Sequence, residues 1–153
     1  MDALREHLLA LLRGGQAYDT FEEIVGEFRP DERFVVPPGG ERSAWQIVEH
    51  MKIALKDILE FSENEDGSYK QRDWPAEYWP VSPSGDWEGS VQGYLDVRGR
   101  MESLMSDESK DLFRVFRWGE GQTLLREALL AADHQAHHLG QLIELKRWVA
   151  TLQ

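Results

Sequence analysis

The sequence contains no cysteine among its 153 residues, so it can form neither a disulfide framework nor a cysteine-based zinc site. Any thiol chemistry would therefore need a thiol that arrives with a substrate. The lack of cysteine also agrees with a cytoplasmic protein, because disulfides are rare in that compartment.

Basic residues are also scarce, with 17 Lys and Arg against 28 Asp and Glu and a net charge of −11. Proteins that bind nucleic acid or anionic membranes need a basic surface, so we expect neither partner. No apolar run approaches the ~18 residues of a membrane span, and the N-terminus lacks the pattern of a signal peptide. The sequence therefore predicts a soluble cytoplasmic protein whose acidic surface aids solubility.

Apolar residues recur at helical spacing in most of the chain, and no segment alternates convincingly like a strand. Gly14 and Gly15 interrupt the first helical segment, and Thr20 with Glu23 forms a capping-box pattern that restarts it. Ser43 caps the second long helix. The predicted helices cover residues 2–13, 20–28, 43–62, 86–106 and 123–152. These patterns predict an all-α fold in one domain, 1–153: a four-helix bundle with long loops and a short or broken first helix.

Residues 63–85 form an unusually long loop for so small a domain. The segment 74–80, which includes Trp74 and Trp79, is too aromatic to be left in water. We expect it to pack over one end of the bundle. It would be either a lid on the core with no ligand or, through Trp74 and Trp79, the wall of a pocket.

The five histidines include a pair, His134 and His138, that lies one turn apart on one face of the last helix. His50 lies at the edge of the apolar stripe of the second long helix. Helical bundles build metal sites from side chains on facing helices, so these three histidines are the candidate ligands of one divalent metal ion. His137 points about 100° away from His138, and His7 has no partner at metal spacing, so we predict that neither is a ligand.

Histidine ligands usually have a partner for their second ring nitrogen. Gln46, one turn before His50, and Gln141, one turn after His138, are candidates. Each also has an ordinary interpretation, Gln46 in the helix cap and Gln141 as a polar flank. A metalloprotease is excluded, because the residue after His134 is Gln135, which cannot act as the general base that this class needs.

Three neutral imidazoles would leave a coordination position open, as in catalytic zinc sites. Zinc and nickel both accept imidazole and are the expected ions. Such an ion can turn water or a substrate thiol into a nucleophile near neutral pH. Because the ligands must be neutral, we expect metal affinity to fall below a pH of about 6.5.

Residues 43–50 and 121–142, and above all 133–141 (DHQAHHLGQ), resemble the DinB-like (YfiT-like) superfamily. The aromatic segment 74–80 is similar to one branch of that family. The resemblance implies a four-helix bundle, often a homodimer, with a metal held at the positions of His50, His134 and His138. This chain departs from the family at His137, where an aromatic residue, often Tyr, is expected.

Relatives in this superfamily resemble thiol transferases that use a low-molecular-weight thiol, or metal-dependent hydrolases or isomerases. We therefore predict a metal-dependent enzyme acting on a small-molecule substrate, by thiol transfer to an electrophile or by hydrolysis. Two alternatives remain. One is a non-catalytic metal- or small-ligand-binding protein of a stress response. The other is a structural helical dimer with a fortuitous histidine cluster.

Overall fold

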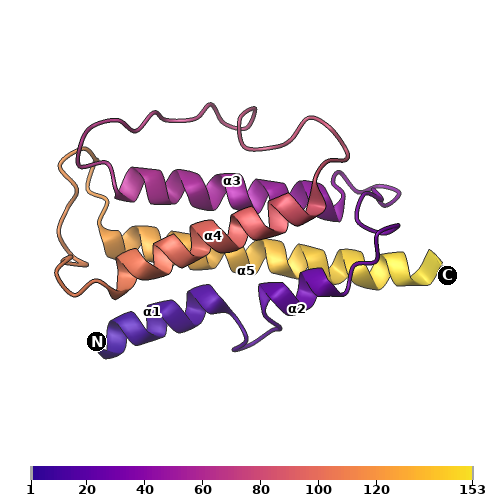
Figure 1. Cartoon of the computed structure of the whole chain (residues 1–153), viewed down its shortest axis with the longest axis horizontal. Helices are drawn as coiled ribbons and strands as arrows, with labels where there is room; N and C mark the ends of the chain where they lie inside the picture. The colour runs from indigo at the N-terminus through magenta and orange to yellow at the C-terminus, as the bar shows by residue number, and fades with distance from the viewer. Residues whose placement is uncertain (1, 153) are drawn as a thin grey trace.

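The computed structural model describes residues 2–152, and within them it is built from helices joined by loops (Figure 1). The only strand-like feature in that range is an isolated bridge between Val115 and Thr123. The prediction of an all-α fold is confirmed. The elements are α1 (Ala3–Arg13), α2 (Phe21–Gly26), α3 (Ala44–Ser62), α4 (Trp87–Ser106), α5 (Leu124–Val149) and a final 3-10 turn (Ala150–Leu152).

The helices begin where their capping residues predict. The Ser43 side chain accepts from the backbone N–H of Gln46, and the Gln46 side chain accepts in return from the backbone N–H of Ser43. Thr20 and Glu23 form the same reciprocal pair at the start of α2. Each pair satisfies backbone donors that have no partner inside the helix.

The first helical segment is broken as predicted. α1 ends at Arg13, and the chain then passes through Gly14 and Gly15, whose φ angles are 77° and 72°. Glycine adopts positive φ without the steric cost that a Cβ imposes. α1 and α2 consequently follow one another along the same side of the molecule (Figure 1).

α3 and α4 run parallel, which explains the long connection between them. At their starts, Trp45 Nε1 donates to Ser90 Oγ, and at the other end Arg100 pairs with Glu63. The chain must therefore return along the whole of α3, about 28 Å for 19 residues. The connection runs along the outer side of α3 (Figure 1). Its aromatic segment 74–80 packs on α3 through Tyr78 and Trp79, whereas we expected that segment over one end of the bundle.

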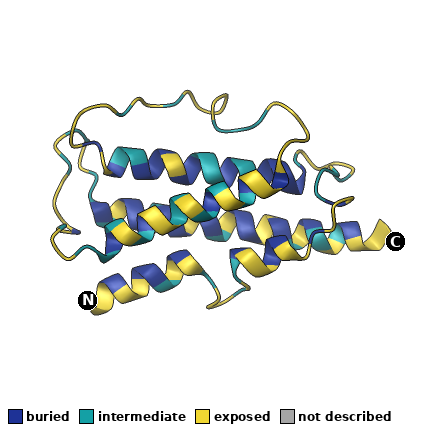
Figure 2. Cartoon of the chain, viewed as in Figure 1, coloured by how far each residue is buried: buried dark blue, intermediate teal, exposed yellow. Residues whose placement is uncertain are grey.

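The buried residues of each helix lie mainly on the side that faces the other helices, so the core lies along the long axis of the molecule (Figure 2). α5 runs antiparallel to α3 and packs against it, which brings residues 84 positions apart into contact. No helix within residues 2–152 is both long and apolar enough to cross a membrane. The α3–α5 interface is where the candidate histidines lie.

Candidate metal centre

His50 reaches the interior because it continues the buried face of α3. Ile47 and Ala54, three residues before it and four after it, are both buried, and His50 itself is only 1% exposed. Residues at this spacing share one side of a helix. The ring of His50 therefore faces α5 rather than solvent.

α5 supplies the other two imidazoles from one face. His134 and His138 lie four residues apart, with their ring centroids 4.4 Å from each other. His138 is buried and His134 is partly buried. Ala131 and Leu142 are buried on the same side of the helix, so the pair points into the α3–α5 interface.

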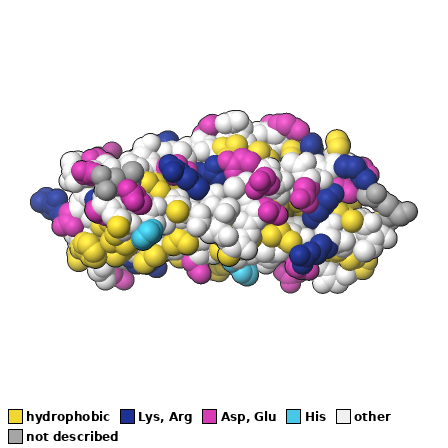
Figure 3. Space-filling model, turned by 90° about the horizontal axis from the view of Figure 1, so that it is seen from below, with side chains coloured by type: hydrophobic (Ala, Val, Ile, Leu, Met, Phe, Trp, Pro, Cys, Tyr) yellow, Lys and Arg dark blue, Asp and Glu magenta, His cyan; other side chains and the backbone are white. Residues whose placement is uncertain are grey.

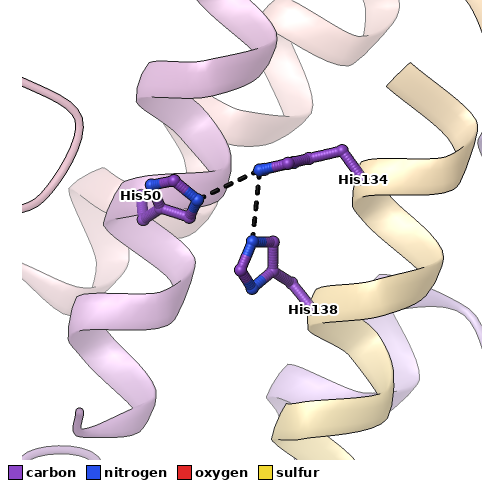
Figure 4. Close-up of side chains that lie close together, drawn as sticks. All are labelled: His50, His134 and His138. Carbon is purple, nitrogen blue, oxygen red and sulfur yellow. Dashed lines mark hydrogen bonds between the residues drawn. The ribbon is translucent and has the colours of Figure 1, made fainter. Parts of the chain in front are cut away.

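The three rings converge on one point, as Figure 4 shows. Nε2 of His134 lies 3.0 Å from Nε2 of His50 and 3.1 Å from Nε2 of His138. One ligand nitrogen from each residue lies within 4.8 Å of the others. The structure thus brings together the three histidines that the sequence singled out.

These separations fit a shared ion. Nitrogens bound at about 2.05 Å to one tetrahedral zinc lie about 3.3 Å apart. The two Nε2 pairs that include His134 are close to this separation, and all three ligand nitrogens lie within 4.8 Å of one another. Three protein nitrogens leave the fourth position of such a site for a small molecule. The donor set therefore matches an open, rather than a closed, metal centre.

Hydrogen bonds on the far side of two rings fix the tautomers that metal binding needs. The Tyr78 backbone carbonyl lies 2.9 Å from Nδ1 of His50, and a carbonyl oxygen can only accept, so Nδ1 carries the proton. Nδ1 of His138 donates in the same way to Oε1 of Gln141 at 2.8 Å. The Nε2 atoms of both rings consequently direct lone pairs, not protons, toward the common point.

Burial keeps the three rings neutral. Desolvation, reinforced by the neighbouring histidines, lowers the pKa of His134 to about 3. Desolvation also lowers the pKa of His138, to about 4, and that of His50. The folded protein thus keeps His134 and His138 neutral well below pH 6.5, and burial favours the neutral form of His50 as well. The expected loss of metal affinity moves to lower pH than the ordinary pKa of histidine suggests.

Aromatic side chains from the long connection cover His50. The ring of Trp79 stacks on it, with centroids 3.8 Å apart and planes within 4°. Trp74 stands edge-on at 6.4 Å and remains 66% exposed. The guanidinium of Arg42 lies 4.9 Å from the Trp79 ring centroid. Trp79 therefore covers one face of the His50 ring, whereas Trp74 lies further out.

The two glutamines differ in their roles. Gln141 contacts His138 as described, and its Nε2 lies 3.2 Å from Nε2 of His137. The side chain of Gln46 is used in the α3 cap, and its Nε2 donates to the Ser82 carbonyl. The partner of His50 is instead the Tyr78 carbonyl.

Sequence reasoning missed Tyr78 because a backbone carbonyl carries no side-chain signature. The available signal was indirect, namely an aromatic segment in an unusually long connection. The two remaining histidines, His7 and His137, are exposed, and neither joins the cluster.

Comparisons with known proteins agree with this arrangement. The sequence model of the DinB superfamily matches residues 15–142, which include all three histidines. Searches of curated proteins and of solved structures gave no significant match. Because the family match spans most of its length, the chain belongs to the DinB superfamily.

Proposed function

We propose that this protein binds one divalent metal ion through His50, His134 and His138 and uses it as an enzyme on a small-molecule substrate. The observation that carries the proposal is the convergence of three Nε2 atoms from two facing helices, with the tautomers of His50 and His138 set for ligation. Zinc and nickel suit an all-imidazole donor set.

The reaction class follows from the open coordination position. A bound ion would lower the pKa of water or of a thiol and so supply a nucleophile at neutral pH. The protein's own residues hold and orient the three rings, and Trp79 shields the His50 ring from solvent. We therefore propose hydrolysis or, with a low-molecular-weight thiol as cosubstrate, thiol transfer to an electrophile. With no cysteine in the chain, the thiol must come with that cosubstrate.

The wider organisation of the protein is part of the same proposal. Counting α1 and α2 as one broken helix gives the four-helix bundle that the family resemblance implies. Cytoplasmic localisation and a homodimer are proposed on composition and on that resemblance. Sedimentation of the untagged protein measures the dimer directly.

Metal analysis tests the site. Untagged protein should contain close to one zinc or nickel ion per chain, and His134→Ala should lose it while keeping its helical circular dichroism. The loss in affinity should exceed the roughly 10- to 100-fold that removal of an outer partner costs. His7→Ala, an exposed histidine on α1, is the matched control and should bind metal as the parent does.

Two further results separate the candidate functions. Zinc at about 100 times its dissociation constant should stabilise the parent by about 2.7 kcal/mol, raising its melting temperature by roughly 5–11 °C. His134→Ala should show no such shift. Metal binding without turnover of thiol and electrophile pairs or of hydrolysable esters and amides would favour the non-catalytic alternative. Equal metal content in parent and His134→Ala would leave only the fortuitous-cluster alternative.

A further inference from the structure

Asp57 is a buried acidic residue on the same side of α3 as His50, seven residues further along. It is 9% exposed. Its carboxylate accepts two phenolic hydroxyls from the long connection. Tyr69 donates to Oδ1 at 3.2 Å and Tyr78 donates to Oδ2 at 2.6 Å. Arg72 Nε lies 3.5 Å from Oδ1, so three side chains of the connection meet at this one carboxylate of α3.

Tyr78 connects this carboxylate to the metal centre, because its side chain and its backbone each make a hydrogen bond. Its hydroxyl is held by Asp57, and its backbone carbonyl accepts from Nδ1 of His50. The two α3 residues are separated by about 10.5 Å along the helix axis, two turns at 1.5 Å per residue. One tyrosine residue spans that distance and ties the orientation of its own peptide group to Asp57.

Tyr69 provides an internal comparison. It donates to the same carboxylate, but the carbonyl that accepts from His50 Nδ1 belongs to Tyr78. Removing either hydroxyl takes away one bond to Asp57. Only removal of the Tyr78 hydroxyl should loosen the carbonyl that holds the imidazole.

We propose that Asp57 is a positioning residue for the metal centre, which acts through the Tyr78 hydroxyl to hold the Tyr78 carbonyl against Nδ1 of His50 and so keeps Nε2 of His50 free to ligate. This inference rests on the proposed metal-binding function. It gives the long connection a role beyond covering the core, because that segment sets the tautomer and angle of one ligand.

Paired tyrosine variants test the proposal. Tyr78→Phe removes the hydroxyl but keeps the ring and the carbonyl, and Tyr69→Phe makes the same chemical change on the other partner. Zinc affinity, measured by competition with a chromophoric chelator, should fall about 10-fold in Tyr78→Phe, at the low end for loss of an outer partner. In Tyr69→Phe it should change less than about two-fold, although the melting temperatures of the two metal-free variants fall alike.

A second readout needs no metal. In a long-range ¹H–¹⁵N spectrum of the metal-free parent, His50 should appear as the single tautomer protonated on Nδ1. Tyr78→Phe should show a mixture of tautomers, whereas Tyr69→Phe should match the parent. Asp57→Ala should repeat the affinity loss of Tyr78→Phe, and the double variant should lose no more than either alone. If Asp57→Ala does not fold, the tyrosine pair decides the question.

Equal affinity losses in the two tyrosine variants, or parental affinity and a parental His50 spectrum in Tyr78→Phe, would overturn the proposal and leave Asp57 a purely structural anchor. A parent that binds no zinc would instead refute the proposed function. In that case the tautomer spectra would still decide whether Asp57 positions His50.

Discussion

At the scale of single residues, Tyr94 and Gln135 form a polar contact in the middle of the apolar core. The Tyr94 hydroxyl donates to Oε1 of Gln135, and the two side chains are 1% and 2% exposed. Nε2 of Gln135 has no hydrogen-bond partner in the part of the chain that the structure describes. The amide therefore depends on Tyr94 for its only hydrogen bond within those residues.

We expect Tyr94→Phe to destabilise the protein by about 1–3 kcal/mol, because it leaves a buried amide without any partner. The double variant Tyr94→Phe/Gln135→Leu should recover part of this loss, since two apolar groups replace the polar pair. Urea unfolding of the metal-free proteins measures both free energies. Equal stability of parent and Tyr94→Phe would contradict this account of the contact.

The candidate ligands could be predicted from the sequence for a physical reason. His134 and His138 meet because helical spacing fixes their faces, and His50 follows from the apolar stripe of α3. Asp57 lies on the same side of α3, so the sequence could also have predicted that it lies near His50. The contact of Tyr78 with His50 could not be predicted, since the path of the connection from the end of α3 to Tyr78 follows no period.

At the scale of secondary-structure elements, helix boundaries were predictable and helix directions were not. Capping residues such as Ser43 and Thr123 act locally, so they mark helix starts in the sequence itself. Whether α4 runs parallel or antiparallel to α3 depends on packing between residues such as Trp45 and Ser90. The length of the connection was the only hint of a crossover, because antiparallel neighbours need only a short turn.

Gly14 and Gly99 differ in what they contribute: Gly14 has a backbone geometry that needs glycine, whereas Gly99 only lowers the helix propensity of α4. Gly14 ends α1 with φ 77° and ψ −158°, a region that is essentially closed to residues with a Cβ. Gly99 lies exposed inside α4, and a Cβ added there would meet no atom within 4 Å. Gly14→Ala should cost about 1–3 kcal/mol, whereas Gly99→Ala should stabilise by up to about 1 kcal/mol. Chemical denaturation measures the free energy of unfolding of both variants. A stabilising Gly14→Ala would mean that the break between α1 and α2 does not require glycine at this position.

At the scale of the whole molecule, charge is spread rather than segregated on the face seen in Figure 3. Acidic and basic side chains lie interspersed there, and apolar side chains gather toward the end where α1 lies. Leu4 and Leu11 of α1 are 38% and 47% exposed. On this face no single sign of charge dominates.

Acid sensitivity follows from those histidines. In the unfolded chain their pKa is about 6.5, whereas burial holds His134 near 3 and His138 near 4 and lowers the pKa of His50. At pH values between the folded and the unfolded pKa of these histidines, unfolding takes up protons. The free energy of unfolding is therefore greatest above pH 6.5 and falls as the pH falls toward 4. Glu127, whose pKa burial raises, opposes the trend in part.

Near pH 5.5 we expect unfolding of the metal-free protein to take up about two protons, the number that unfolded His134 and His138 bind there. The lowered pKa of His50 adds to this number, and the raised pKa of Glu127 subtracts from it. The slope of unfolding free energy against pH, measured in urea with a chelator present, gives this number. His134→Ala should reduce it by about one, since that residue no longer titrates. A free energy of unfolding that stays constant from pH 7 to 5 would mean that the three rings are not buried as neutral imidazoles. The folded protein would then not hold a preformed set of metal ligands.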